Sequence, residues 1–157
     1  MKKHNIKIQL YDIKYQVIIF LLTPGVNLNV LKNITNYKKI HGVIMLTFGI
    51  GDGPTSNSVF INTLNYLRDN NIYVVNVSQT GEGRVDQTDY ATGTALSKAG
   101  VISGADMTME AAYCKLLFIF SKYGNKDRKL VVQKMGEELS GEMSSHLLLS
   151  DVSPIYQ

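Results

Sequence analysis

The sequence predicts an α/β fold in which helices cover both faces of a short parallel sheet of about four strands, giving three layers (α/β/α). Three apolar runs lack the alternation of a half-buried strand and are bounded by glycine or proline, which is typical of strands covered on both faces. A segment with apolar residues at helical spacing follows each run. The repeated order of strand, loop and helix indicates a right-handed series of βαβ units.

The first two units each begin with an apolar run. A strand is expected over residues 15–22, followed by a helix that Asn27 can cap. The second strand is expected over residues 42–48. After a glycine-rich loop, either Ser56 or Asn57 can cap the next helix.

The third unit has the same order. We expect a strand over residues 72–77, a polar loop over residues 78–89 and a short helix over residues 90–98 that Gly100 closes. The sequence leaves residues 101–106 open, as a turn or as a fourth strand at the edge of the sheet.

Two further helices are expected after the third unit. The first, capped by Asp106 or Thr108, is apolar nearly all round from residue 111 to 120, so we expect the sheet and a partner to bury it. Cys114 lies within it and is interpreted as a small core residue. The second helix is expected over residues 127–139.

The length of 157 residues favours one domain, which we place at residues 15–143, between a leader of uncertain structure at 1–14 and a tail at 144–157. A single cysteine excludes an internal disulfide and a cysteine-built zinc site, and three scattered histidines argue against a metal cluster. The longest apolar stretch is far shorter than the roughly 20 residues of a membrane span. We therefore expect a cytoplasmic chain with no membrane partner.

The net charge of +3 is concentrated at the start of the chain, where residues 1–39 carry seven lysines and one acid. A basic arm can bind nucleic acid. These lysines alternate with apolar residues, however, which is the pattern of a solvated strand face. We therefore expect no nucleic-acid partner.

Polar side chains gather in two loops, residues 49–56 and 78–89. Because the carboxyl ends of parallel strands meet at one edge of a sheet, we expect both loops to open there. The glycine loop could hold a phosphate, but Pro54 removes an amide and Asp52 would repel an anion, so we favour a tight turn. The polar loop residues are Asp52, Thr55, Ser56, Gln79, Thr80, Glu82, Arg84, Asp86 and Tyr90. By themselves they name no reaction, because no histidine or lysine adjoins the threonines as a base.

The chain carries an ordered set of segments: Thr23-Pro24-Gly25, Gly42-Val43, Thr47-Phe48-Gly49-x-Gly51-Asp52-Gly53-Pro54, Val75-Asn76-Val77-Ser78-Gln79, Gly83-Arg84-Val85-Asp86, Tyr90-Ala91-Thr92-Gly93, Ala99-Gly100-Val101-Ile102-Ser103-Gly104-Ala105-Asp106-Met107-Thr108, Glu110-Ala111-Ala112 and Lys115-Leu116. Together they resemble the carboxyl-terminal domain of cytosolic (type I) L-asparaginases, over roughly residues 15–143. The resemblance implies a Rossmann-like or flavodoxin-like fold.

The resembled family hydrolyses asparagine to aspartate and ammonia, with a threonine nucleophile and no cofactor or metal. Its catalytic threonines belong to an amino-terminal domain. The 157 residues hold no Thr-Gly-Gly-Thr or His-Gly-Thr-Asp-Thr stretch. The resemblance therefore implies half of an enzyme, with no catalytic nucleophile, no activity by itself and asparagine as a substrate only through the missing domain. It also implies a homo-oligomer.

In that family the active site lies between the amino-terminal domain of one subunit and the carboxyl-terminal domain of its neighbour. The resemblance gives Tyr90 an accessory role as a positioning or proton-relaying hydroxyl, the alternative being a buried tyrosine bonded to backbone. Asp52 stands where the family usually has asparagine, and would contact the substrate ammonium or act as a turn cap. The expected substrate-binding set is Asp52, Gln79, Thr80, Arg84 and Asp86. The carboxylate at position 52 could lower activity.

Two other functions stay open. The glutaminase subunit of archaeal tRNA-dependent amidotransferases shares the Gly-Arg-Val and Asp-Met segments, although residues 103–106 favour asparaginase. The chain could also be a non-catalytic module that binds a small amino acid or assembles with itself.

Overall fold

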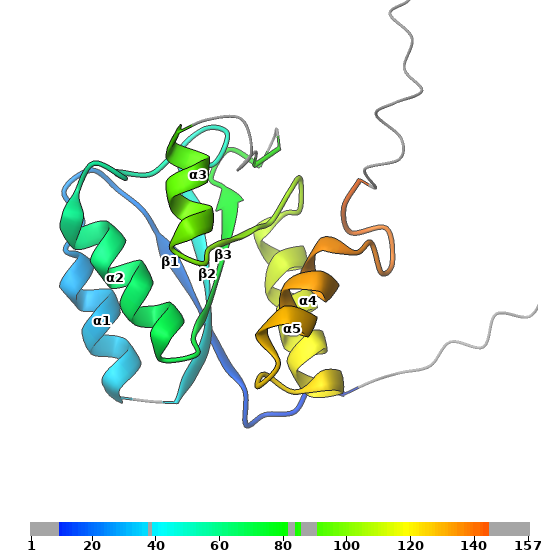
Figure 1. The fold of residues 1–157 in the computed structure, drawn as a ribbon. Helices are drawn as coiled ribbons and strands as arrows, with labels where there is room; N and C mark the ends of the chain where they lie inside the picture. Colours follow the sequence, from blue (N-terminus) through cyan, green and yellow to red (C-terminus); the bar gives the residue numbers. More distant parts are fainter. Residues whose placement is uncertain (1–9, 38, 82–83, 86–90, 145–157) are drawn as a thin grey trace, which may run out of the picture.

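A parallel sheet of four strands, in chain order, forms the centre of the molecule (Figure 1). The computed structural model describes residues 10–37, 39–81, 84–85 and 91–144. The strands are β1 (Gln16–Leu21), β2 (Ile40–Thr47), β3 (Tyr73–Ser78) and β4 (Ile102–Ser103). The predicted parallel sheet is confirmed, and β4 settles the open alternative in favour of a short edge strand.

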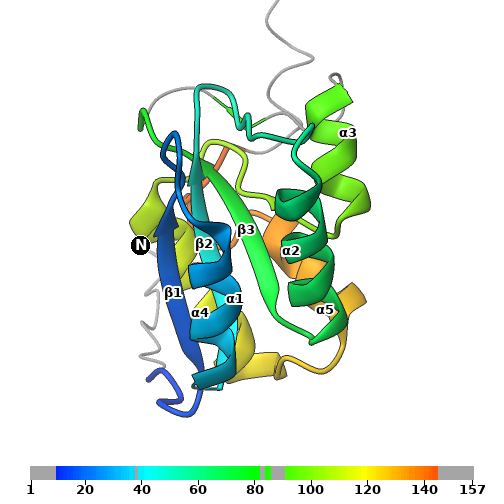
Figure 2. The same ribbon diagram turned by 90° about the vertical axis from the view of Figure 1, so that its left-hand side faces the viewer.

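Helices cover both faces of this sheet (Figures 1 and 2). On one face lie α1 (Leu28–Tyr37), α2 (Ser58–Asp69) and α3 (Ala91–Lys98), and on the other lie α4 (Met109–Tyr123) and α5 (Arg128–Gly136). Right-handed crossovers between strands in sequential order place every crossover helix on the same face, which leaves the second face to the helices after β4. The predicted three layers are confirmed. None of the helices in the described ranges combines the length and the apolar character that a bilayer crossing requires.

Side-chain caps fix where three of the helices begin. The side chain of Asn57 accepts a hydrogen bond from the amide of Val59 and begins α2. The hydroxyl of Thr108 accepts from the amide of Ala111 at the start of α4. Of the two caps that the sequence allowed in each place, the structure therefore uses Asn57 and Thr108. Asp127 caps α5 in the same way.

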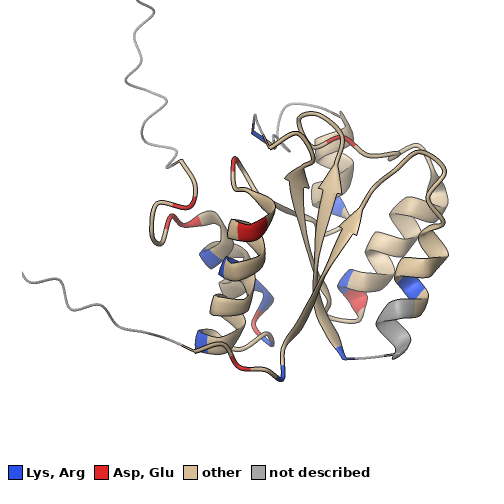
Figure 3. Cartoon of the chain, turned by 180° about the vertical axis from the view of Figure 1, so that it is seen from behind, with Lys and Arg blue, Asp and Glu red and all other residues tan. Residues whose placement is uncertain are grey.

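The sheet separates two apolar cores, because alternate side chains of a strand point to opposite faces. In β2, Val43 and Met45 pack into the core beneath α1 and α2, whereas Ile44 packs into the core beneath α4 and α5. The strands carry no lysine, arginine, aspartate or glutamate, and Figure 3 shows these residues on helices and loops only. The position of β2 and β3 between two cores explains why their runs lack alternation, whereas Ile19 and Leu21 of the edge strand β1 are exposed.

The interpretation of Cys114 as a core residue is wrong, because the structure places this side chain in solvent. The residues of α4 that enter the core lie at helical spacing: Ala112, Leu116, Ile119 and Phe120. Cys114 is two residues after Ala112, which turns it to the other side of the helix. A helix that is apolar nearly all round gives little contrast between its faces, so the sequence could not identify the inner one.

A candidate site at the carboxyl edge of the sheet

Two loops that follow β2 and β3 meet at the carboxyl edge of the sheet. The hydroxyl of Ser78, the last residue of β3, donates a hydrogen bond of 2.6 Å to the carbonyl of Gly49. The side-chain amide of Asn76 donates one of 2.9 Å to the carbonyl of Gly51. Both loops therefore open on one edge, as the parallel topology predicts, and this edge is where open α/β sheets bind ligands.

The glycine loop is a tight turn. The amide of Phe48 donates to the carbonyl of Asp52 over 3.0 Å, and the amide of Asp52 donates back over 2.8 Å. Gly49 and Gly51 have φ angles of +50° and +107°, which the turn requires and other residues rarely adopt. The turn predicted in place of a phosphate cradle is therefore observed. It leaves the side chain of Asp52 exposed at the rim of the edge.

A buried polar pair, Thr47 and Asn76, lies under this turn. Neither residue is exposed, and the Thr47 hydroxyl donates to the Asn76 side-chain oxygen over 2.5 Å. Both stand in largely apolar, buried strands, where an unpaired polar group would be costly. Sequence reasoning missed this pair. The sequence does show one such polar residue in each of the two apolar runs. That the two residues are hydrogen-bonded to each other is visible only in the structure.

Two of the expected substrate-binding residues, Gln79 and Thr80, make hydrogen bonds within the protein at the carboxyl edge. The side-chain nitrogen of Gln79 donates to the carbonyls of Leu22 and Leu46, which ties the ends of β1 and β2 together. The hydroxyls of Thr80 and Ser78 lie 2.8 Å apart. Because an amide nitrogen has two protons, only the oxygen of Gln79 is left for a ligand.

Arg84 lies half-buried beside Asp106, in the loop that follows β4. Hydrogen bonds from Ser144 and the positive charge of Arg84 outweigh burial and lower the pKa of Asp106. A cation therefore stands next to the edge. The other two expected residues, Asp86 and Tyr90, are outside the described residues, so their roles stay predictions. In the described ranges no three His, Cys, Asp or Glu side chains gather in a way that could hold a metal ion.

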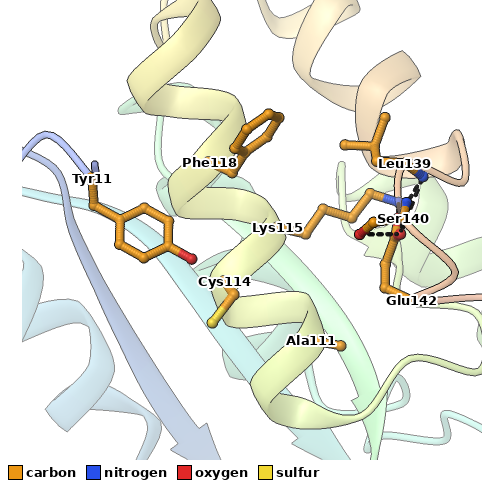
Figure 4. A pocket seen from close by; sticks show the side chains of 8 residues that line it. All are labelled: Tyr11, Ala111, Cys114, Lys115, Phe118, Leu139, Ser140 and Glu142. Atoms are coloured by element: carbon orange, nitrogen blue, oxygen red, sulfur yellow. Dashed lines mark hydrogen bonds and ion pairs between the residues drawn. The ribbon is translucent and has the colours of Figure 1, made fainter. Parts of the chain in front are cut away.

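A cavity of about 290 Å³ lies on the outer face of α4, and none of its lining residues belongs to the carboxyl-edge loops (Figure 4). Tyr11, Cys114 and Phe118 form one side of it, and residues 139–142 form the other. At its base the Lys115 ammonium lies 2.7 Å from the Glu142 carboxylate, with side chains 2% and 12% exposed. This pair fastens the chain after α5 onto α4.

Glu142 is expected to make stability depend on pH. Burial would raise its pKa, but hydrogen bonds from Lys115 and from backbone amides outweigh burial and lower the pKa from 4.5 to about 2. As the pH falls, the unfolded chain binds this proton first, so stability is complete above about pH 5 and declines toward pH 2. We expect a loss of at most about 3 kcal/mol, measured by urea unfolding across this range.

Glu142→Gln is the control for this prediction, because other carboxylates with lowered pKa values, such as Asp106, act in the same direction. The variant should show a flatter dependence of stability on pH than the unaltered chain. Identical slopes in the two proteins would contradict the assignment to Glu142.

Comparison with known proteins identifies the family of the fold. The family model described as "Glutaminase/Asparaginase C-terminal domain" matches residues 16–134. L-asparaginase 1 of Escherichia coli is 35% identical over 126 residues, which are 80% of this chain and 36% of that protein. A glutamyl-tRNA(Gln) amidotransferase polypeptide of Methanococcus maripaludis is 29% identical over 138 residues, which are 88% of this chain and 31% of that polypeptide.

A solved structure agrees with these matches. L-asparaginase I of Vibrio cholerae superposes with a TM-score of 0.73 and 38% identity, covering 82% of this chain and 37% of that one. The chain thus spans about a third of the length of these two curated relatives. The match extends from the first residue of β1 into α5, so it includes both loops of the carboxyl edge. The chain belongs to the glutaminase/asparaginase C-terminal domain family.

Proposed function

We propose that this domain supplies one wall of an amide-hydrolysing site that acts on asparagine, and that the attacking hydroxyl comes from an amino-terminal domain like that of L-asparaginases. The observation that carries the proposal is the carboxyl edge, where two loops are fastened side by side and present polar groups outward. Relatives named L-asparaginase match most of this chain in sequence and fold, which supports the same use of this edge.

The charges of the edge suit an amino-acid substrate. Asparagine carries an ammonium and a carboxylate besides the amide that is cleaved. In the proposal Asp52, exposed at the rim, contacts the ammonium, and Arg84 attracts the carboxylate. Thr80 and the free oxygen of Gln79 supply weaker polar contacts, with Asp86 completing the set. Tyr90 positions the reacting group or relays a proton as an accessory hydroxyl.

The threonine nearest the turn, Thr47, is not placed to act as a nucleophile, which agrees with a domain that supplies only a wall of the site. An attacking hydroxyl needs a base within hydrogen-bond reach and access to the substrate. Thr47 has neither, because it is buried and donates its proton to an amide oxygen. The domain therefore contributes binding and positioning in the proposal, and the chemistry of bond cleavage belongs to the partner surface.

The proposal predicts no hydrolysis by the 157-residue chain and hydrolysis by a suitable chimera. The chimera carries this chain in place of the matching 126-residue segment of E. coli L-asparaginase 1. We expect ammonia release from asparagine by the chimera only, and a higher KM for asparagine with Asp52→Asn, which removes the negative charge that contacts the substrate ammonium. A rate from the purified chain, or a folded chimera without activity, would overturn the proposal.

The same preparations separate the other candidates. A glutaminase function would appear as a chimera that prefers glutamine to asparagine. A binding module would appear as heat of asparagine or aspartate binding to the 157-residue chain in calorimetry.

We also propose self-association, supported by the exposed Ile19 and Leu21 on the edge strand β1. Light scattering during gel filtration measures it, and a monomer at all concentrations would contradict it.

A further inference from the structure

Asn76 is a polar residue in the middle of a completely buried strand. It lies in register with Met45 of β2 and Ser103 of β4, and none of its surface is exposed. Burying a side-chain amide costs several kcal/mol unless hydrogen bonds replace its water. A leucine would fill such a strand position without that cost. The presence of a buried amide at this position is explained by its hydrogen-bond partners.

The partners of Asn76 come from three different segments. Its side-chain oxygen accepts from the hydroxyl of Thr47, and its side-chain nitrogen donates to the carbonyl of Gly51 over 2.9 Å. Its backbone carbonyl accepts from the amide of Gly104 over 2.7 Å. One buried residue thus joins the end of β2, the glycine loop and the loop after β4.

The two loops press closely on Asn76. A Cβ atom on Gly51 would lie 3.2 Å from the side-chain nitrogen of Asn76, and one on Gly104 would lie 2.6 Å from its backbone oxygen. Both glycines therefore allow an approach that another residue would prevent. The carbonyl of Gly51 fixes the orientation of the amide, because a carbonyl only accepts and so must face the nitrogen, while the Thr47 hydroxyl donates to the amide oxygen.

From these contacts we infer that Asn76 is a positioning residue, which holds the glycine loop so that the carboxylate of Asp52 faces the substrate. The inference rests on the proposed function. Asn76 acts through one bond: it holds the carbonyl of Gly51, and the next residue is Asp52, whose backbone closes the turn on Phe48. Without that bond the turn keeps its internal hydrogen bonds and the Ser78 bond at Gly49, but Gly51 loses its attachment to the sheet.

Hydrogen exchange in the 157-residue chain tests the attachment directly. Asn76→Asp keeps the acceptor for Thr47 but replaces the donor to Gly51 with an oxygen. We expect the amides of Gly51 and Asp52 to exchange about tenfold faster, with amides of α4 unchanged. Thr47→Val frees the amide to rotate and should accelerate the same amides less, which keeps the test decisive if Asn76→Asp fails to fold.

Ser78→Ala is the matched control, because it removes the other bond to this loop, at Gly49, and leaves Asn76 untouched. We expect little change at Gly51 and Asp52 in this variant. Unchanged exchange in both Asn76→Asp and Thr47→Val would overturn the inference. Equal acceleration by Ser78→Ala would also overturn it, because the loop would then respond to any lost contact.

Kinetics of the chimera separate positioning from simple loss of structure. If Asn76 places Asp52 against the substrate, Asn76→Asp should raise KM about tenfold and change kcat much less. In an Asp52→Ala background the same change should add almost nothing, since the group it positions is gone. If Asn76→Asp raises KM by the same factor with and without Asp52→Ala, the inference is overturned. An inactive chimera would count against the proposed function, and the exchange experiment would then decide the role of Asn76.

Discussion

Replacing Lys115 with methionine is expected to lower the free energy of unfolding by about 3 to 5 kcal/mol, the cost of breaking a buried ion pair from one side. The Lys115 side chain is 2% exposed, and its ammonium has three partners: the Glu142 carboxylate at 2.7 Å, the Glu137 carbonyl at 2.6 Å and the Met143 sulfur at 3.1 Å. Methionine fits the space of the lysine stem but leaves the carboxylate of Glu142 largely buried without its cation. Urea unfolding at neutral pH measures the loss.

Two controls show whether the burial of the pair causes this loss. Lys134→Met removes the cation of a pair with Glu137 that is much more exposed, and should cost far less stability than Lys115→Met. The double variant Lys115→Met with Glu142→Leu removes both charges and should recover most of the stability. A Lys115→Met protein as stable as Lys134→Met would contradict the structural role of the pair.

Lys115 also shows what a single sequence cannot reveal. The sequence indicates α4 from its apolar residues and from a cap at Asp106 or Thr108, and the structure contains the helix with Thr108 as its cap. It does not reveal that a lysine in that helix is buried, because the cover comes from residues 137–143, more than twenty positions away. Cys114 is misplaced for the same reason, since the inner face of a helix is set by its partners.

Some features of the candidate site could likewise be predicted from the sequence, and others could not. The meeting of the two loops follows from parallel strands and could be predicted, as could the tight turn that Gly49 and Gly51 form. The roles of the individual side chains depend on contacts distant in the chain. Gln79 donates to the carbonyl of Leu22, just after β1, and to that of Leu46 in β2, and Asn76 bonds to the turn; no spacing rule predicts these contacts. Local geometry could thus be predicted from the sequence, whereas the hydrogen-bond partners could not.

Gly51→Ala is expected to lower the free energy of unfolding by about 3 to 4 kcal/mol, because two costs of about 1 to 3 kcal/mol each coincide. The φ angle of +107° is unfavourable for any residue with a side chain. The new Cβ would also lie 2.6 Å from a methyl of Val85, which is 2% exposed and has little room to move. Urea unfolding measures the sum of both costs.

Gly49→Ala isolates the first cost within the same turn. Its φ angle of +50° lies in the left-handed region, and nothing stands within 4 Å of an added Cβ, so we expect a loss of only about 1 kcal/mol. The difference between the two variants then combines the contact of the glycine loop with Val85 and Asn76 and the extra strain of the φ angle at Gly51. If Gly51→Ala costs no more than Gly49→Ala, the loop lifts freely from the sheet. A freely lifting loop could not hold Asp52 in place, so this comparison of stabilities also tests the proposed wall of the site.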